Sequence, residues 1–327
     1  MATDSALISI VIPVLNEAEC LPRLHAELRR VCDPLANYCF EFLFVEGGST
    51  DGTSDVLRAL RQADERVRFI VQTRNFGFQE AIGCGLQYAR GDAVITMDGD
   101  LQHPPSLIPR LLEHWENGCE VVNTERVETV DQSFLRKLCS ALFYRGFNWL
   151  SGMQIAPNSA DFRLLARPAV DALNQLPERH LFFRGLIPWL GFRQITIPFT
   201  APRRHAGGSK FNLKRNVWFA LDGITAFSFY PLRKVVVFGW LVMLVSLLYA
   251  GYALTYHFVN GTSVPGWTSL LLCVLFLGGC QLLIMGVLGE YLGRVLEQVK
   301  GRPRFVVREV VGFDTTMTAT VATRKSA

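Results

Sequence analysis

The sequence predicts an α/β domain with a mainly parallel sheet, followed by two apolar helices. Over the first 230 residues, short runs of β-branched and other apolar residues alternate with amphipathic stretches, the pattern of a doubly wound sheet. Beyond residue 230 lie two long segments without charged residues. Half of the 327 residues are hydrophobic and 19% are charged, which is apolar for a soluble enzyme. We therefore expect a membrane anchor beside a globular domain.

The expected strands are short apolar runs bounded by turn residues, at 7–14, 40–45, 67–71, 93–97 and 120–123. Helices are expected between them, at 21–31, about 53–60 and 78–89. Thr53 or Ser54 is the expected N-cap of the second helix, because a hydroxyl can accept a hydrogen bond from the first turn. Gly83 and Gly85 in the third helix indicate close packing on the sheet.

A pair of carboxylates, Asp98 and Asp100, follows the strand at 93–97. Open α/β sheets bind ligands at the carboxyl ends of their strands. In an extended segment residues two apart face the same way, so both side chains could face one hard cation such as Mg²⁺ or Mn²⁺. A bare Asp-x-Asp is common, and a solvated turn is the alternative interpretation of this segment alone.

Two loops predict ligand binding. The glycine-rich turn at 46–53 has backbone amides suited to a nucleotide, although it matches neither a dinucleotide fingerprint nor a Walker A loop. The basic loop at 203–210 predicts phosphate binding, with a solvated charge cluster near a membrane as the alternative. His103 and His114 have no partner at metal-ligand spacing and are expected to be structural.

The segment 133–150 alternates aromatic and basic residues, which predicts a helix in a membrane interface. A helix packed on the domain core is the alternative. Segment 211–230 is expected to frame the same interface. The chain after Phe313 is polar and Thr-rich, which predicts disorder.

Residues 235–258 and 269–288 are long and apolar enough to span a membrane. Basic residues flank the pair, while the link between the two segments has none, so the positive-inside rule places the link outside. The predicted organisation is a cytoplasmic domain at 1–230, a transmembrane hairpin at 231–290 and a cytoplasmic tail at 291–327. The expected location is the cytoplasmic membrane, with several spans and both termini in the cytoplasm.

Composition restricts the partners. A net charge of +4 without a basic stripe does not favour nucleic acid. The eight cysteines contain no C-x-x-C pair and are expected to be reduced thiols, and no signal peptide is expected. Gly278, Gly279 and Gly286 in the second apolar segment permit close helix packing, which favours a homo-oligomer.

Several motifs occur in a specific order. They are VIPVLNE at 11–17, GSTDGT at 48–53, RNFG at 74–77, MDGDLQHPP at 97–105, DFRL at 161–164, RHAGGSK at 204–210 and PLR at 231–233. Together they make the chain resemble glycosyltransferase family 2, and within it the polyisoprenyl-phosphate glycosyltransferases. That group includes bactoprenol glucosyltransferases and, more distantly, dolichyl-phosphate mannose synthase.

The resemblance implies a GT-A fold, a nucleotide-sugar donor and a Mg²⁺ or Mn²⁺ ion at Asp98 and Asp100. The residues expected on the nucleotide-sugar side are Pro13, Asn16, Glu17, Glu46, Ser49, Asp51, Asp98 and Gln102. Those expected to hold phosphate or the acceptor are Arg126, Arg136, Arg204, Ser209 and Lys210. Asp100, Asp161 and Arg163 are the expected catalytic residues, with Asp161 orienting the acceptor or the sugar.

The implied reaction is inverting transfer of a hexose, with glucose from UDP-glucose favoured, to undecaprenyl phosphate. Such lipid-linked sugars serve cell-envelope glycans, including O-antigen modification. Glu46-Gly47 departs from the acidic pair that the family usually carries, which lowers the expected nucleotide affinity. The alternatives are another donor (UDP-N-acetylhexosamine, UDP-galactose, GDP-mannose or UDP-aminoarabinose) or a non-catalytic nucleotide-sugar-binding scaffold. A processive synthase is disfavoured because the chain has no Q-x-x-R-W motif and too few spans.

Overall fold

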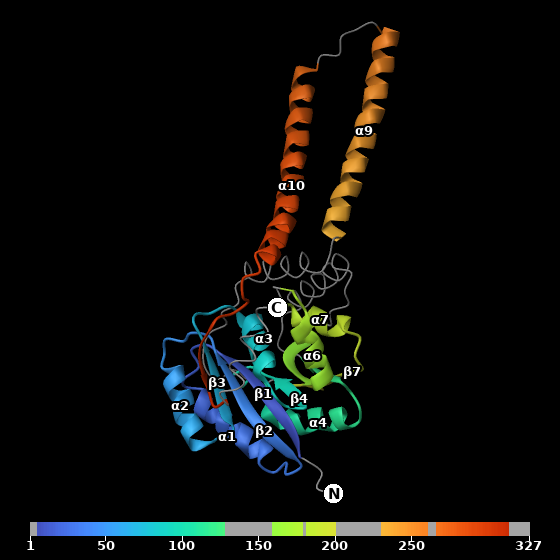
Figure 1. Ribbon diagram of the computed structural model, residues 1–327. Coiled ribbons are helices and arrows are strands. Elements are labelled where there is room, and N and C mark those ends of the chain that lie inside the picture. The colour runs from blue at the N-terminus through green and yellow to red at the C-terminus, as the bar shows by residue number, and fades with distance from the viewer. Residues whose placement is uncertain (1–4, 128–158, 179–180, 201–229, 261–265, 314–327) are drawn as a thin grey trace. The chain divides into compact units, whose positions relative to one another are not determined.

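The computed structural model describes residues 5–127, 159–178, 181–200, 230–260 and 266–313 (Figure 1). The chain forms two compact units. The described part of the first contains a β-sheet and its helices, together with the chain from Pro303 onward. The second contains the two long helices.

Eight strands form one sheet within the described residues, in the order β7-β5-β6-β4-β1-β2-β3-β8. The strands are β1 (Ala6–Val14), β2 (Tyr38–Glu46), β3 (Val67–Gln72), β4 (Ala93–Thr96), β5 (Val121–Arg126), β6 (Ser159–Ala166), β7 (Gln194–Phe199) and β8 (Val307–Val311). Six strands share one direction, while β6 and β8 run antiparallel to their neighbours. The predicted mainly parallel α/β class is confirmed.

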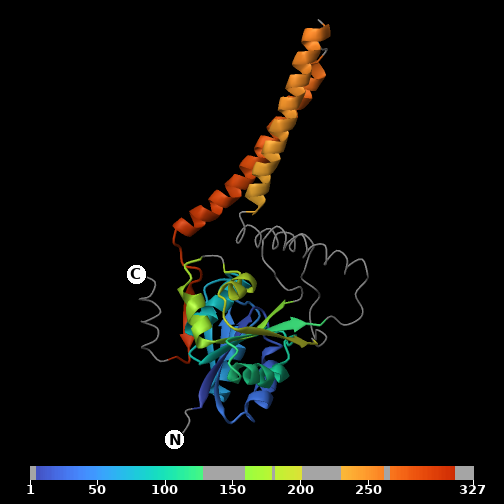
Figure 2. The same ribbon diagram turned by 90° about the vertical axis from the view of Figure 1, so that its right-hand side faces the viewer.

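Helices lie on both faces of the sheet (Figures 1 and 2). One group contains α1 (Leu21–Cys32), α2 (Thr53–Ala63), the short helix η1 (Pro105–Leu107) and α4 (Ile108–Glu116). The other contains α3 (Phe78–Tyr88), α6 (Arg167–Gln175) and α7 (Phe183–Trp189). Contacts join α1 to α2 and α4, and join α6 to α3 and α7, so each group covers one face.

The alternation of side chains along β1 determines which helix packs on which face. Ile8, Ile10 and Ile12 are fully buried in the core cluster that includes leucines of α1. On the opposite face Val11 contacts α3 at Gly85, where an added Cβ would overlap the valine side chain. Each large aliphatic side chain buried in this way contributes about 1.5–3 kcal/mol. The period of two along the strand thus fixes both layers.

The five predicted strands and three predicted helices are present, with boundaries shifted by up to three residues. The predicted N-cap of α2 was wrong: Gly52 occupies that position with φ +85°, and Thr53 is already helical. Gly85 packs on the sheet as predicted. Gly83 instead faces Leu181, whose Cδ1 would lie 3.1 Å from an added Cβ.

Three strands were not predicted. In β6 the polar residues Asp161 and Arg163 interrupt the apolar run. β7 pairs with β5, and β8 pairs with β3 after the two long helices. Phe305, which precedes β8, is 2% exposed. The segment 291–327, expected to be a simple tail, therefore contributes a strand to the first unit.

The described part of the second unit contains α9 (Tyr230–Asn260) and α10 (Trp267–Val299), which run antiparallel (Figure 1). By length and composition, the described residues contain one helix segment able to cross a membrane, Phe276–Val299 in α10, and a shorter apolar stretch, Val237–Tyr249, in α9. The predicted interfacial segments at 133–150 and 211–230 and the predicted disordered tail lie largely or wholly outside the described residues.

Candidate active site

The carboxyl edge of the sheet collects the polar residues that the sequence singled out. β1, β2, β4 and β5 end at this edge, and β6, which runs the other way, begins there. The strand order therefore sets the residues in a row. From one side to the other these are Arg126, then Asp161 and Arg163, then Asp98 and Asp100, then Asn16 and Glu17, and finally Glu46, Ser49 and Asp51. β1 and β4 are neighbours near the middle of the sheet, and the order of the strands reverses between them. Such sheets bind ligands at this topological switch point.

Asp98 and Asp100 lie in a turn. β4 ends at Thr96, and Gly99 and Asp100 form a turn, so the pair does not continue the strand as the extended arrangement assumed. Gly99 packs against the end of β1, where an added Cβ would lie 3.0 Å from Val14 Cγ1. Gly99 therefore lets this turn pack closely against β1, because a larger residue would be in tight contact with Val14.

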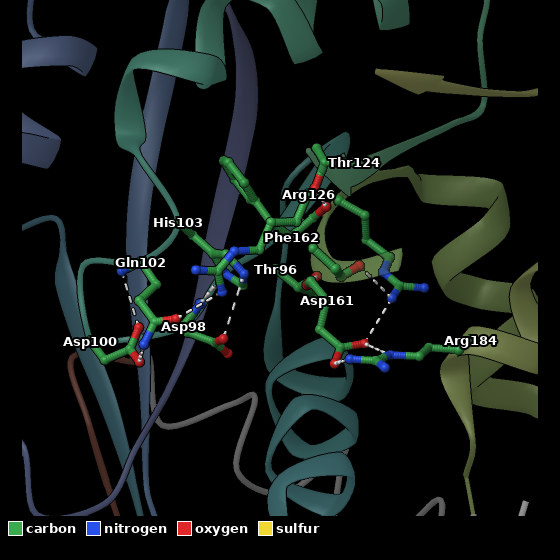
Figure 3. A network of polar contacts seen from close by, with 12 residues as sticks. Thr96, Asp98, Asp100, Gln102, His103, Thr124, Arg126, Asp161, Phe162 and Arg184 are labelled. Carbon is green, nitrogen blue, oxygen red and sulfur yellow. Dashed lines mark hydrogen bonds and ion pairs between the residues drawn. The ribbon is translucent and has the colours of Figure 1, made fainter. Parts of the chain in front are cut away.

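Gln102 connects Asp100 to Arg126 (Figure 3). Its backbone N–H and side-chain Nε2 donate to the two carboxylate oxygens of Asp100 over 3.1 and 2.9 Å. Its Oε1 accepts from Arg126 Nη1 over 3.2 Å. One amide thus orients both a carboxylate and a cation, and it joins the turn after β4 to the end of β5.

His103 belongs to the site, and its prediction as an isolated structural histidine was incomplete. Its Nδ1 accepts the Asp98 backbone N–H over 2.9 Å, and its ring stacks on Phe162 with centroids 5.2 Å apart. Burial lowers the pKa of His103 to about 4. The neutral imidazole therefore carries its proton on Nε2, which lies 3.5 Å from Asp98 Oδ2. His103 holds the acidic turn against β6.

The turns after β1 and β2 are hydrogen-bonded to each other. Asn16 N–H donates to Ser49 Oγ and its Oδ1 accepts from Thr50 N–H, each over 2.9 Å. Asp51 accepts from the N–H groups of Ala18 and Thr53 over 3.1 Å. Burial alone would raise the pKa of Asp51, but these hydrogen bonds lower it below its ordinary value.

Pro13 lies in β1 beside this pair of turns, and Glu17 N–H donates to Thr53 Oγ1 over 3.1 Å. Glu46 is 1% exposed, and its carboxylate accepts the Ser49 N–H. The predicted donor-side residues are therefore brought together, with Glu46 and Asp51 engaged in shaping the turns.

Asp161 bonds to two arginines at the start of β6. Its carboxylate lies 2.8 Å from Arg163 Nη2 and 2.8 Å from Arg184 Nη2. Arg184, from α7, was not among the predicted site residues, because no motif surrounds it. Thr96 Oγ1 donates to Asp161 O over 2.7 Å, which ties this cluster to β4 just before the acidic turn.

Four predicted acceptor-side residues lie outside the described residues: Arg136, Arg204, Ser209 and Lys210. In the described part of the chain, no three His, Cys, Asp or Glu side chains gather as a metal cage. An ion that bridges substrate phosphates needs one or two carboxylates, with water and phosphate oxygens completing its shell. Asp98 and Asp100 offer this donor set, and the side chain of Asp98 is 33% exposed. They fit the predicted divalent cation.

Comparison with known proteins gives a consistent result. Residues 9–173 match the family model described as glycosyl transferase family 2. An uncharacterized glycosyltransferase of Synechocystis sp. is 39% identical over 307 residues, covering 94% of this chain and 96% of the relative. A prophage-derived bactoprenol glucosyl transferase of Shigella flexneri is 39% identical over 302 residues, covering 92% and 97%.

Among solved structures, glucosyl-3-phosphoglycerate synthase from Mycobacterium tuberculosis, in complex with Mn²⁺, UDP and glucosyl-3-phosphoglycerate, is similar with a TM-score of 0.45 and 19% identity. The match covers 67% of this chain and 78% of that one.

Proposed function

The chain belongs to glycosyltransferase family 2, and on this premise we propose that it transfers a hexose from a nucleotide sugar to a polyisoprenyl phosphate. Glucose from UDP-glucose is the favoured donor pair, and undecaprenyl phosphate is the favoured acceptor. The bactoprenol glucosyl transferase of Shigella flexneri, similar over 92% of this chain, supports both choices. The proposed product is a sugar joined to the lipid phosphate with inverted configuration, β-linked from an α-linked donor.

The observation that carries the proposal is the linked series from Asp100 through Gln102 to Arg126. It sets a carboxylate pair beside the donor-side turns and a guanidinium at the end of β5, on the other side of the Asp161 cluster, along one edge of the sheet. A transfer between two phosphorylated substrates needs this combination, because carboxylates can share a cation with the donor diphosphate while arginines offset the charge of the acceptor phosphate.

Asp98 and Asp100 are the residues that would hold Mg²⁺ or Mn²⁺. When bound, such an ion neutralises charge on the departing nucleoside diphosphate. The chain's own groups do the rest. Gln102 and His103 orient the acidic turn, and Arg126 and Arg163 add positive charge at the same edge. We include Arg204, Ser209 and Lys210 as phosphate ligands on the strength of their motif.

The attacking group is the acceptor phosphate itself. A phosphate monoester has a second pKa near 6, so it is largely a dianion at pH 7 and needs no strong base. The site has to position this anion and stabilise the leaving diphosphate. The reaction therefore does not require a carboxylate that acts as a general base beside the acceptor.

We also propose that α9 and α10 cross the membrane as a hairpin, with the sheet-containing unit in the cytoplasm. Two observations support this. Both helices are long and apolar, and the chain returns after α10 to place β8 in the sheet that precedes α9. A chain that leaves one domain and returns to it crosses a membrane an even number of times. The hairpin would hold the catalytic edge near lipid-borne phosphate.

A homo-oligomer is part of the proposal. Gly278, Gly279 and Gly286 of α10 have open space where a Cβ would lie. Small residues let the backbones of two membrane helices approach closely, so this face of α10 suits another copy of the chain.

The test uses the full chain purified in detergent, with undecaprenyl phosphate, Mg²⁺ or Mn²⁺, and a panel of radiolabelled nucleotide sugars. Label that moves into the organic phase reports transfer. We expect one donor, UDP-glucose, to be used. Asp100→Asn keeps the size of the side chain but removes its charge, and it should lower the rate by about 100-fold or more.

The matched control is Asp33→Asn, because the Asp33 side chain is 43% exposed and lies between the end of α1 and the start of β2, at the opposite edge of the sheet. It should transfer sugar as the unmodified chain does. Transfer from a different donor would overturn the proposed identity of the sugar but would still support the proposed transfer reaction. No transfer from any donor, with nucleotide still bound, would favour the scaffold over the enzyme.

A further inference from the structure

Both carboxylate oxygens of Asp161 accept hydrogen bonds from arginines (Figure 3). Oδ1 lies 2.8 Å from Arg163 Nη2 and 3.2 Å from Arg184 Nε. Oδ2 lies 2.8 Å from Arg184 Nη2. Arg184 thus binds the carboxylate in a bidentate manner through two nitrogens, which is the strongest and most directional arrangement for an arginine–carboxylate pair.

The cluster is buried unevenly. The side chain of Arg163 is 3% exposed and that of Asp161 is 10% exposed, whereas that of Arg184 is 29% exposed. Two guanidinium groups and one carboxylate leave one net positive charge. Arg184 is the member through which this charge reaches solvent.

The cluster is also fixed relative to the acidic turn. Thr96 pairs with Arg163 across β4 and β6, and its hydroxyl donates to the Asp161 carbonyl. Two residues after Thr96 the chain reaches Asp98. In the view of Figure 3, Asp161 lies between Arg184 and Asp98. A shift of Asp161 would therefore be transmitted through Thr96 towards Asp98 and the proposed donor site.

We propose that Arg184 is a further positioning residue of the transfer reaction, acting through Asp161, which serves as the ionised anchor of two arginines and not as a proton acceptor. The inference rests on the function proposed above. The anchored pair of guanidiniums presents its positive charge to the anionic acceptor, and the acceptor phosphate supplies its own nucleophilic oxygen.

The surroundings of Asp161 support this role. The charged and titratable groups that face it, among the described residues, are Arg163 on its own strand, Arg184 on α7 and His103 in the loop after β4. Burial alone would raise the pKa of Asp161, but Arg184 and Arg163 lower it below the ordinary value. A general base needs an accessible lone pair and a pKa near the working pH. Three hydrogen bonds from arginines already occupy most of the lone pairs of this carboxylate, and its pKa is lowered below the ordinary value.

The test is a double-mutant cycle on the full chain in detergent, with Asp161→Asn, Arg184→Gln and the double variant. Each single variant should lower kcat/KM for undecaprenyl phosphate by about tenfold or more, because each breaks the same forked contact. The double variant should lose no more activity than the less active of the two single variants, since the two residues act as a unit. Arg184→Gln should raise the KM for the lipid phosphate and leave the KM for the donor unchanged.

The pH profile separates the two roles of Asp161. If Asp161 were the base, Arg184→Gln would leave a more basic carboxylate, so activity would persist with its acid limb moved to higher pH. If Arg184 acted independently of Asp161, the two single losses would multiply. Either result overturns the inference. Arg184→Lys keeps the charge without the fork and should restore only part of the activity.

Controls distinguish this failure from others. Arg58→Gln removes an arginine whose acidic partners are exposed, and it should change neither KM. Thermal melts of every variant identify loss of fold. If the unmodified chain transfers no sugar, the proposed function fails and the inference fails with it. If the unmodified chain is active but the cycle shows no coupling, only the inference fails.

Discussion

At the scale of single residues, Glu46 and Gly47 are where the donor side departs from the acidic pair expected there. Glu46 is buried, and its carboxylate accepts the Ser49 N–H, so it organises its own turn. Gly47 is buried too, with its N–H bonded to Val14 O over 3.0 Å. The Glu46 carboxylate is engaged within its own turn and Gly47 has none, and the reduced nucleotide affinity expected from the sequence stays a prediction.

Gly47→Asp should therefore tighten binding of the donor nucleotide. An added Cβ would lie 3.5 Å from Leu15 Cδ1 and 3.6 Å from Val14 O, which are ordinary contacts, so the fold should tolerate the change. A new carboxylate hydrogen-bonded to a nucleobase is expected to contribute about 1.5–3 kcal/mol, or roughly 10-fold or more in affinity. Calorimetric titration with UDP measures the effect. Gly47→Asn is the uncharged control, and weaker binding by the aspartate variant would contradict the prediction.

How far single residues can be found from sequence depends on their spacing. Asp98, Asp100 and Gln102 lie in one short motif, and the structure joins them as neighbours. His103 was expected to be structural because it has no partner at metal-ligand spacing. Its ring stacks on Phe162 of β6, a contact between distant parts of the chain that the sequence does not reveal. Arg184 bonds to a residue 23 positions away through a helix that no motif marks.

At the scale of secondary-structure elements, a charged link joins α1, α2 and β3. His25 of α1 lies 3.0 Å from Asp64 Oδ2, just beyond α2. Arg66, just before β3, donates to both oxygens of Asp64 over 3.0 and 2.9 Å. Burial alone would raise the pKa of Asp64, but bonds from Arg66 and His25 lower it to about 2. The link stabilises the packing of three elements.

Asp64 should make stability depend on pH in acid. Its pKa is lower folded than unfolded, about 2 against roughly 3.9, so the unfolded chain binds more protons between these values. The contribution, about 2 kcal/mol, should be complete above about pH 5 and lost as the pH falls through about 2. Asp64→Asn should lower the melting temperature at pH 7, and its difference from the unmodified chain should shrink at pH 2.5. Glu65→Gln, at an exposed position, is the control; a difference that grows in acid would contradict the assignment.

Gly85→Ala tests the packing of α3 on β1. An added Cβ would overlap Val11 Cγ1 and lie 3.3 Å from Val11 Cβ, and Val11 is fully buried. Overpacking of this kind costs about 1–3 kcal/mol, so the melting temperature should fall. Gly83→Ala meets the flexible end of Leu181 at 3.1 Å and should cost less. Removing the obstacle with Val11→Ala in the same chain should recover part of the loss, and equal effects at both glycines would refute the packing argument.

The elements also differ in how well the sequence predicts them. β1 to β5 are apolar runs between turn residues, and their local pattern is enough. β6 alternates polar and apolar residues because it carries Asp161 and Arg163 into the site, so its function obscures the strand pattern. β8 has five residues, and its partner β3 lies more than two hundred positions earlier. Pairing at that distance leaves no local signal.

At the scale of the whole molecule, β8 makes the chain return to its starting unit. Thr73 N–H donates to Val306 O over 3.0 Å, and Arg58 Nη2 lies 2.6 Å from Glu309 Oε2. Phe313 packs edge-on against Tyr88, with ring centroids 5.7 Å apart. These contacts tie the chain after α10 to the sheet that also contains β7, which precedes α9, and this supports the proposal that the hairpin has both ends on the same side of a membrane.

This topology predicts which cysteines a membrane-impermeant maleimide can reach. Cys39 is exposed on the sheet-containing unit and serves as a native reporter of the cytoplasmic side. Ser263→Cys places a second reporter in the link that the positive-inside rule puts outside. In spheroplasts the reagent should modify position 263 and leave Cys39 unmodified until lysis, with peptide mass spectrometry separating the two sites. Modification of Cys39 in intact spheroplasts would put the sheet outside and reverse the orientation. Protection of both sites until lysis would mean that the helices do not cross, whereas the expected pattern requires two crossings. Both outcomes satisfy the even number that a chain returning to its own sheet requires, so the labelling decides between them.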